Sequence, residues 1–242
     1  MGHQVTRIFA HRGSRLRAPE NTARAFALAM DEGADGVELD VRTCRTGEVV
    51  VVHDRDLWRC GGDAREVHEL PWRDLCAIDV GAGERVPLLD EVLDLVIARG
   101  GAVNVEVKGD VPDRPATARA VARVLLRRPA REHDRILLST FDPLTFLVLR
   151  AEARGFTHGF LFDRTHSGAY RAIVIRRLLR PDAVHPEQIL ATPSAIARWH
   201  RRGLAVHVWT VNDPERARAL AAAGADILIT DDPAAIRAAL PD

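Results

Sequence analysis

Three acidic residues lie on strand-like segments of this 242-residue chain, at spacings typical of a metal site. Glu38 and Asp40 lie in GVELDV (36–41), and Glu106 lies in AVNVEVK (102–108). Because alternate residues of a strand point to the same face, Glu38 and Asp40 are expected to project together. Crowded carboxylates repel one another and lose solvation unless a cation neutralises them. Oxygen ligands of this kind suit one divalent metal ion, Mg²⁺ or Ca²⁺.

Two histidines, His11 and His53, end strand-like segments beside these acids. Imidazole titrates near neutral pH, so a pair of histidines at an acidic cluster indicates a general acid and a general base. Arg12 carries the planar fork that clamps phosphate oxygens, and Lys108 carries a compact positive charge. A cation, basic groups and a proton donor/acceptor pair are what phosphoryl transfer needs. The alternative is structural: an ion network in which the acids pair with Arg12 or Lys108.

Lys108 is the one lysine among 34 lysine and arginine residues. An ammonium and a guanidinium are not interchangeable in a tight site, because they differ in size, shape and donor geometry. The solitary lysine therefore predicts a position that arginine does not fit. Chance survival in an arginine-rich sequence is the alternative.

Nine strand-like segments alternate with mostly longer helix-like segments. The strand-like segments cover residues 5–10, 36–41, 48–54, 102–108, 135–140, 157–162, 182–185, 204–209 and 225–230. Strands separated by helices predict parallel βαβ units, whose functional residues follow the carboxyl ends of the strands. We expect an α/β fold, a (β/α)₈ barrel of the TIM type. A doubly wound open sheet is the alternative, but the Gly-rich loop that it would place after the first strand is missing.

One strand-like segment is more than a closed eight-stranded barrel uses. Segments 36–41 and 48–54 are joined by RTCRTG alone, which is too short for a crossover helix. One of the two is therefore predicted to be a hairpin arm or a rim extension. Residues 54–86 lack a long amphipathic pattern and are predicted to form an inserted loop or short helix. No linker interrupts the chain, so residues 1–242 are expected to form a single domain.

Composition excludes several classes of protein. The formal net charge is zero and the sequence pI is about 7.2, which argues against a nucleic-acid or membrane-surface binder. No apolar run approaches the roughly 18 residues of a membrane helix, so no integral membrane association is expected. Three cysteines without C-x-x-C spacing predict free thiols and a cytoplasmic protein. The oligomeric state is left open, with a homo-oligomer as one option.

Several sequence blocks together resemble the glycerophosphodiester phosphodiesterase family. AHRGSRLRAPENTARAF (10–26) is similar to the family's His-Arg-Gly and Pro-Glu-Asn-Thr signature, and GVELDV, VVHD and VEVKG match the next blocks in order. Weaker matches follow in RVPLLDEVL, LLSTF, VWTVN and ILITDDP. The resemblance spans nearly the whole chain. Within the first block, Asn21 or Thr22 is expected to cap the first helix, with contact between residues 19–22 and the substrate as the alternative.

The resemblance implies a barrel enzyme with a small insertion after the His-Asp block. Its substrate would be a small-molecule glycerophosphodiester, hydrolysed to sn-glycerol 3-phosphate and an alcohol. The implied roles are metal binding by Glu38, Asp40 and Glu106, acid/base catalysis by His11 and His53, and phosphate contacts by Arg12 and Lys108. The turn at 45–48 and the segment 59–61 depart from the family pattern, which bears on substrate fit more than on activity.

Four other residues receive weaker assignments. Trp209 and Phe141 are candidates for the wall of the substrate pocket on its alcohol side, with a plain core role as the alternative. His185 and His207 are expected to be structural, with His207 out of phase with Trp209 on its strand.

Two other functions remain as alternatives. A related barrel phosphodiesterase acting on lysophospholipids or sphingomyelin would expose an apolar lip, and the loops show no obvious one. A non-catalytic barrel that binds a phosphorylated metabolite is disfavoured, because both histidines and all three acids are present.

Overall fold

The computed structural model describes residues 5–165 and 178–240, and eight strands of this part form a closed parallel barrel. The barrel strands are β1 (Arg7–His11), β2 (Gly36–Thr43), β6 (Ala102–Val107), β7 (Ile136–Thr140), β8 (Thr157–Phe162), β9 (Ala183–Pro186), β10 (Ala205–Val208) and β11 (Ile227–Thr230). They pair in the order β1-β11-β10-β9-β8-β7-β6-β2, and β1 pairs with β2 to close the barrel. The expected (β/α)₈ barrel is confirmed, and the open-sheet alternative is wrong.

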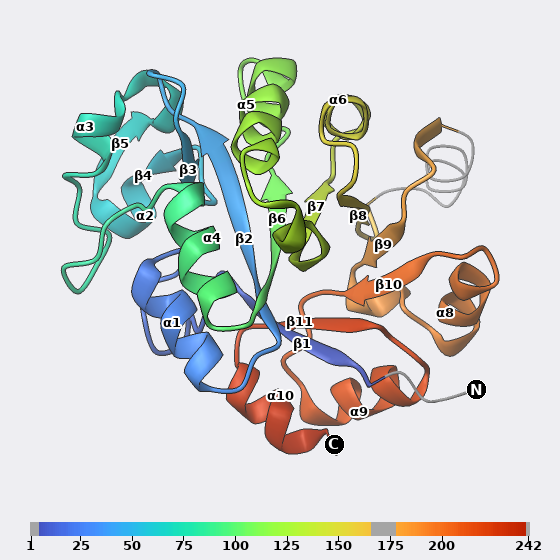
Figure 1. Ribbon diagram of the computed structural model, residues 1–242. Coiled ribbons are helices and arrows are strands. Elements are labelled where there is room, and N and C mark those ends of the chain that lie inside the picture. The colour runs from blue at the N-terminus through green and yellow to red at the C-terminus, as the bar shows by residue number, and fades with distance from the viewer. Residues whose placement is uncertain (1–4, 166–177, 241–242) are drawn as a thin grey trace.

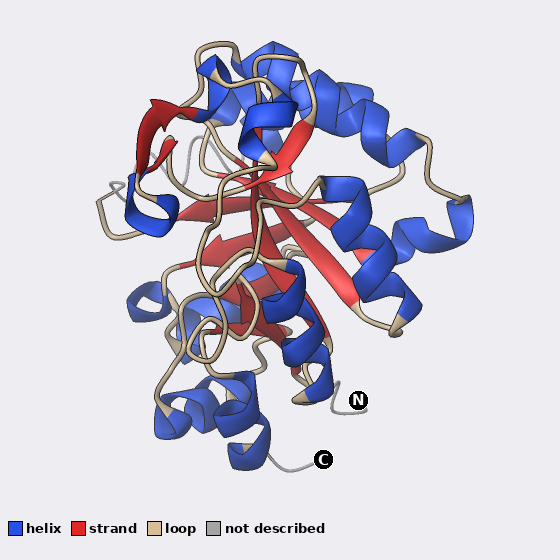
Figure 2. Ribbon diagram, turned by 90° about the vertical axis from the view of Figure 1, so that its left-hand side faces the viewer, coloured by secondary structure: helices blue, strands red, loops and turns tan. Residues whose placement is uncertain are grey.

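Helices surround the strands (Figures 1 and 2). They are α1 (Ala23–Asp31), α4 (Leu89–Ala98), α5 (Arg114–Leu126), α6 (Pro143–Glu152), α8 (Pro193–His200), α9 (Pro214–Ala222) and α10 (Pro233–Ala239). The helices α6, α8, α9 and α10 each begin with an Asp or Thr N-cap followed by proline. The capping side chain accepts a free backbone N–H, and proline suits the first helical position. Over residues 5–165 and 178–240, no helix is long and apolar enough to cross a membrane.

The extra strand-like segment lies outside the barrel. It forms β3 (Val49–Val51), which pairs antiparallel with the end of β2, so the predicted hairpin arm is confirmed. Residues after β3 form a small insertion beside the barrel, coloured teal in Figure 1. It contains β4 (Asp56–Leu57), α2 (Trp58–Gly61), β5 (Asp63–Glu66), a 3₁₀ turn (Val67–Glu69) and α3 (Trp72–Leu75). The β4–β5 hairpin was not expected, because the polar sequence DARE carries no alternation of apolar and polar residues.

Strand side chains alternate between the barrel interior and the surrounding helices. On the outer side, Ile8, Val206 and Leu228 belong to one buried cluster with residues of α8 and α9. Inside the barrel, a second buried cluster fills the space toward the amino ends of the strands; it consists of Phe9, Ala102, Leu137, Ile227 and Ile229. The carboxyl ends of the strands are thereby left for polar side chains.

Two buried histidines, His185 on β9 and His207 on β10, form a pair inside the barrel, with His207 Nδ1 2.8 Å from His185 Nε2. Gly159 leaves room for this pair, since a Cβ there would lie 2.2 Å from His185 Nε2. Their burial agrees with a structural role, but the reason given for it is wrong. His207 and Trp209 share a strand face because they are two residues apart, and Trp209 Nε1 donates to the backbone oxygen of His185 (2.8 Å).

Candidate active site

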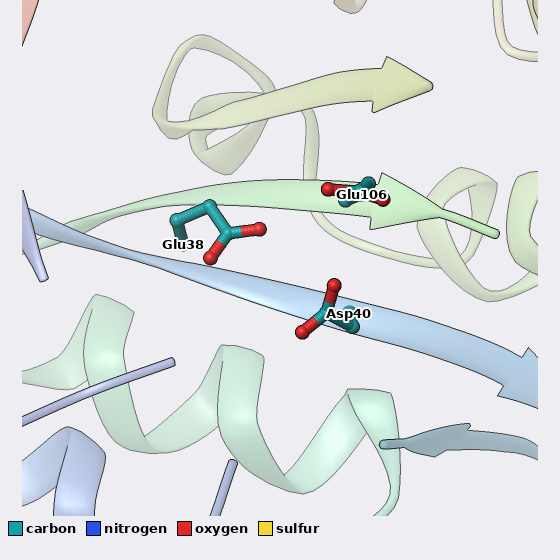
Figure 3. A group of neighbouring side chains, drawn as sticks. All are labelled: Glu38, Asp40 and Glu106. Atoms are coloured by element: carbon teal, nitrogen blue, oxygen red, sulfur yellow. The ribbon is translucent and has the colours of Figure 1, made fainter. Parts of the chain in front are cut away.

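Three carboxylates gather at the carboxyl ends of neighbouring strands. Glu38 and Asp40 lie on β2, Glu106 lies on β6, and Asp40 is directly opposite Glu106 in the strand register (Figure 3). All three are buried, and one oxygen from each lies within 4.8 Å of the others. Oxygens bound to one Mg²⁺ or Ca²⁺ at about 2.0–2.6 Å are at most about 5 Å apart. The donor set and its spacing therefore fit a single hard divalent cation.

Two cationic side chains enter the same cluster. Lys108 Nζ lies 2.8 Å from Asp40 Oδ1 and 2.7 Å from Glu106 Oε1, and Arg12 Nε lies 3.2 Å from Asp40 Oδ2. Burial alone raises a carboxyl pKa, but Lys108 and Arg12 outweigh it and lower the pKa of Asp40. The pKa of Glu38 is raised well above its usual value by burial and by the neighbouring Asp40 and Glu106 charges. Both ideas from the sequence thus hold in geometry: the acids are ion-paired, and they form a metal-sized cluster.

A strained turn holds Arg12 at the cluster. Arg12 has φ +58° and Gly13 has φ +82°, a left-handed conformation that non-glycine residues rarely adopt. Gly13 is required here, because a Cβ would lie 2.7 Å from the Cβ of Ala25. The backbone N–H of Arg12 donates to the backbone oxygen of Glu38 over 2.8 Å. Strain of this kind gathers at functional sites, where the surrounding structure holds it in place.

His11 is held at the cluster by a residue that the sequence did not single out. Its Nδ1 lies 2.6 Å from Asp231 Oδ1, and its Nε2 lies 3.9 Å from Glu38 Oε2. Asp231 follows β11 and also accepts a hydrogen bond from Asn212 Nδ2 over 2.7 Å. Both residues belong to sequence blocks that match the family weakly, VWTVN and ILITDDP, and those blocks were the available signal.

His53 has an equivalent partner next to it in the chain. Its Nδ1 lies 2.6 Å from Asp54 Oδ1, and Arg59 Nε of the insertion donates to Asp54 Oδ2 over 2.7 Å. Burial lowers the pKa of His53, with Lys108 adding to the shift and Asp40 opposing it. A carboxylate at Nδ1 fixes the ring and its tautomer, leaving Nε2 for proton transfer. Both histidines are held in this way.

The segment between β1 and α1 supplies three different contacts. Thr22 caps α1 by accepting from the N–H of Ala25, as expected. Asn21 Nδ2 donates to Asp40 Oδ2 over 3.0 Å, and Glu20 Oε1 accepts from Arg12 Nη1 over 3.0 Å. The sequence pattern predicted a cap here, but it did not predict that Asn21 and Glu20 contact the acid–arginine cluster.

One cavity of about 370 Å³ contains all but one of the expected site residues; it is lined by His11, Arg12, Glu38, His53, Glu106, Lys108, Phe141, Leu161, Trp209, Thr210 and Ile229. Asp40 is buried next to it. The rings of Phe141 and Trp209 meet edge to face with centroids 5.5 Å apart. A wider groove of about 940 Å³ adjoins the cavity and shares His53, Glu106, Lys108 and Phe141 with it. The arrangement offers an inner cavity and an outer groove joined at the charged cluster.

Comparisons with known proteins identify the family of this chain. The model of the glycerophosphoryl diester phosphodiesterase family matches residues 11–235. A glycerophosphodiester phosphodiesterase of Caldanaerobacter subterraneus is 28% identical, covering 94% of this chain and 95% of the relative.

Two solved structures share the fold over nearly their whole length. A phosphodiesterase of Oleispira antarctica, solved in complex with the product sn-glycerol-3-phosphate, has a TM-score of 0.88 and 26% identity, covering 97% of this chain and 96% of its own. A glycerophosphodiester phosphodiesterase of Thermotoga maritima has a TM-score of 0.79 and 28% identity, with coverages of 96% and 97%. The chain therefore belongs to the glycerophosphoryl diester phosphodiesterase family, a family of phosphoric diester hydrolases.

Proposed function

We propose that this chain hydrolyses small-molecule glycerophosphodiesters to sn-glycerol 3-phosphate and an alcohol, and that residues 1–242 act as one barrel domain in the cytoplasm. The observation that carries the reaction is the pair of carboxylate-held histidines lining one cavity with Glu38 and Glu106. The product bound to the Oleispira antarctica phosphodiesterase supports the same substrate class.

Glu38, Asp40 and Glu106 would hold one divalent cation, Mg²⁺ or Ca²⁺, because their oxygens lie within 4.8 Å of one another and belong to hard ligands. When bound, such a cation polarises a phosphoryl oxygen and neutralises developing negative charge. Arg12 and Lys108 add positive charge at the cavity wall and orient the phosphate. With Arg12 fixed by the turn at Gly13, this charge is already in place before the substrate binds.

The two histidines take different roles in the proposal. His11 lines the inner cavity but not the outer groove. We therefore assign its Nε2 to take the proton from the attacking hydroxyl, which belongs to water or to the substrate's own glycerol. His53 lines both the cavity and the groove, so its Nε2 donates a proton to the leaving alcohol. With water as nucleophile, the new P–O bond forms as the bond to the alcohol breaks, which gives sn-glycerol 3-phosphate directly. With the glycerol hydroxyl as nucleophile, the same step gives a cyclic phosphate, and water then opens the ring to sn-glycerol 3-phosphate. In each step one proton is taken up while another is given. Trp209 lines only the cavity, so we assign it to the glycerol instead of the alcohol side expected from the sequence. Phe141 lines both spaces and keeps its assignment to the alcohol side.

The experiment is hydrolysis of glycerophosphocholine, glycerophosphoethanolamine and bis(p-nitrophenyl) phosphate. Release of sn-glycerol 3-phosphate from the first two substrates is expected, with loss of activity in EDTA and recovery with Mg²⁺ or Ca²⁺. Activity that survives EDTA would remove the metal from the proposal, and no release of sn-glycerol 3-phosphate would remove the reaction. Cation binding is checked separately by calorimetry, in which Asp40→Asn should weaken the affinity.

A second substrate class is favoured by one observation. Leu16, in the loop after β1, and Trp58, at the start of α2, are 64% and 68% exposed, although the sequence shows no obvious apolar lip in the loops. The two segments are joined by an ion pair between Arg59 and Glu20 (2.6 Å). Exposed apolar side chains suit the acyl chain of a lysophospholipid. A higher kcat/KM on lysophosphatidylcholine than on glycerophosphocholine, reduced by Trp58→Ser, would favour this class.

A further inference from the structure

A single carboxylate, that of Glu20, binds three arginines at the edge of the site. Glu20 Oε1 lies 2.6 Å from Arg59 Nη2 and 3.0 Å from Arg12 Nη1, and Glu20 Oε2 lies 2.9 Å from Arg15 Nη2. The side chain is 12% exposed, so water screens these contacts little. Burial alone raises the pKa of Glu20, but the hydrogen bond from Arg59 and the charges of Arg12 and Arg15 lower it, so the carboxylate stays charged.

From Glu20 one arm leads to His53. Arg59 bridges Glu20 and Asp54, and Asp54 Oδ1 lies 2.6 Å from His53 Nδ1. Arg59 belongs to α2 of the insertion, whereas Glu20 belongs to the loop after β1. The insertion is thereby tied to the site through the group that orients His53.

A second arm leads to His11. Arg15 Nη2 contacts Glu20, and Arg15 Nη1 lies 3.5 Å from Asp231 Oδ1. The same Asp231 oxygen lies 2.6 Å from His11 Nδ1. The two histidines are therefore the ends of one continuous chain of charged contacts: His53, Asp54, Arg59, Glu20, Arg15, Asp231 and His11.

We infer that Glu20 is a positioning residue, which sets the orientation of His53 through Arg59, of His11 through Arg15, and of the phosphate-facing Arg12 directly. This inference rests on the proposed function, since it assigns Glu20 to the proposed acid and base. Glu20 holds together three like charges, so its loss removes one carboxylate contact from all three arginines at once. Small displacements matter, because a shift of about 1 Å in a catalytic group can reduce rates by about 100-fold.

The first test is Glu20→Gln, which keeps the shape and removes the charge. We expect kcat to fall about 10–100-fold, the usual effect of removing a group that orients a catalytic residue. The matched control is Glu132→Gln, because Glu132 has a similar exposure (13%) and an ion pair of 2.8 Å with Arg128, and it does not line the cavity or the groove. The control variant should keep its kcat within about twofold, since it loses only a structural ion pair.

The second test separates the two arms with one substrate pair. Glycerophosphoethanolamine releases an alcohol that needs a proton, whereas the p-nitrophenyl ester of sn-glycerol 3-phosphate releases a phenolate that does not. In Arg59→Gln the loss of kcat should shrink on the nitrophenyl ester, because the acid His53 is no longer needed. In Arg15→Gln the loss should be equal on both substrates, because the base His11 is needed for each. Arg59 and Arg15 are 49% and 27% exposed, so these variants test the inference even if Glu20→Gln does not fold.

The outcomes separate this inference from the proposed function. If His11→Ala and His53→Ala are inactive but Glu20→Gln turns over at the wild-type rate, the inference about Glu20 is overturned and the proposed roles stand. If either histidine variant is fully active, the proposed roles themselves fail. Equal losses of kcat in Arg59→Gln on both substrates would also overturn the inference, because the effect of a merely structural defect does not depend on the leaving group. Circular dichroism and thermal unfolding confirm that each variant is folded.

Discussion

Two pairs of histidines, one at the mouth of the barrel and one enclosed within it, differ in almost everything that decides reactivity. His11 and His53 each have Nδ1 on a carboxylate and border a cavity of about 370 Å³. His185 and His207 are hydrogen-bonded to each other and enclosed by strands. Burial lowers the pKa of His185 to about 3, and burial, His185 and Arg7 together lower that of His207, so this pair is neutral at physiological pH.

The difference shows that residue type alone does not identify a catalytic histidine. All four side chains belong to strands or follow their ends, yet one pair has acidic partners that orient it, and the other has none among residues 5–165 and 178–240. A carboxylate fixes the tautomer and favours the charged form of imidazole, whereas an enclosed apolar environment removes that form. Reactivity therefore depends on the group that each imidazole ring contacts through its nitrogen atoms.

The largest effect that distinguishes the two pairs is on catalysis. His11→Ala or His53→Ala should lower kcat by about 10²–10⁴-fold, the usual contribution of a positioned proton-transfer group. The measurement is steady-state hydrolysis of glycerophosphocholine, with a circular dichroism spectrum for each variant.

The matched variant in the other pair is His207→Gln, which keeps a polar group at a buried position. Its kcat should stay within about twofold of the wild type, because the ring does not line the cavity or contact the acids. Near-normal turnover in His11→Ala or His53→Ala, or a large loss of kcat in a folded His207→Gln, would break the comparison.

A smaller effect is expected on stability. The folded-state pKa of His185 and of His207 lies below the unfolded value of about 6.5, so the unfolded chain binds more protons. Their contribution is fully present above pH 6.5 and falls as the pH drops toward the folded values, by about 1.4 kcal/mol per pH unit for each histidine. His207→Gln should therefore lose less stability than the wild type between pH 7 and pH 5, because it no longer has the lowered pKa of His207. Urea unfolding at the two pH values measures this, and parallel losses would show that His207 is protonated in the folded state.

Most of the barrel was predictable from the sequence, because β-branched runs alternate with helices whose ends carry strong signals. The short RTCRTG link showed that segment 36–41 or segment 48–54 was one strand too many, and the structure shows that it is 48–54, which forms β3. The hairpin β4–β5 was not, because its polar residues are stabilised by contacts within the insertion rather than by a periodic pattern. Local sequence indicates an element only where that element buries one regular face.

The site was predictable at strand ends and less so in loops. Glu38, Asp40 and Glu106 were recognisable because spacing along a strand fixes the side-chain direction. The contacts of Asp231 and Glu20 were not, although Glu20 belongs to the segment 19–22 that was considered for substrate contact. Each residue acts through a contact between segments far apart in sequence: 220 residues separate Asp231 from His11, and 39 separate Glu20 from Arg59. Such contacts depend on barrel closure and on the folded position of the insertion, which no local pattern encodes.

The smallest effect concerns Lys108, the one lysine of the chain. Its Nζ lies between Asp40 Oδ1 and Glu106 Oε1, at 2.8 and 2.7 Å, and so contacts two of the three proposed metal ligands. Arginine serves every other positively charged position in the sequence, but its planar head is larger and presents its donors in a fixed fork. At this position the guanidinium would displace the carboxylates or the phosphate, whereas an ammonium fits between two oxygens.

Lys108→Arg should therefore lower kcat/KM by roughly tenfold, about 1.4 kcal/mol of transition-state stabilisation, although the charge is kept. Lys108→Met should be at least as damaging, because Asp40 and Glu106 then lose a buried counter-ion. Both variants are compared with the wild type on glycerophosphocholine, and circular dichroism confirms folding. The His185–His207 pair is enclosed by strands, where the size and shape of a side chain matter more than its charge. The Lys108 variants test whether the charged cluster also depends on side-chain shape. A wild-type rate in Lys108→Arg would mean that charge alone matters there and that the solitary lysine survived by chance.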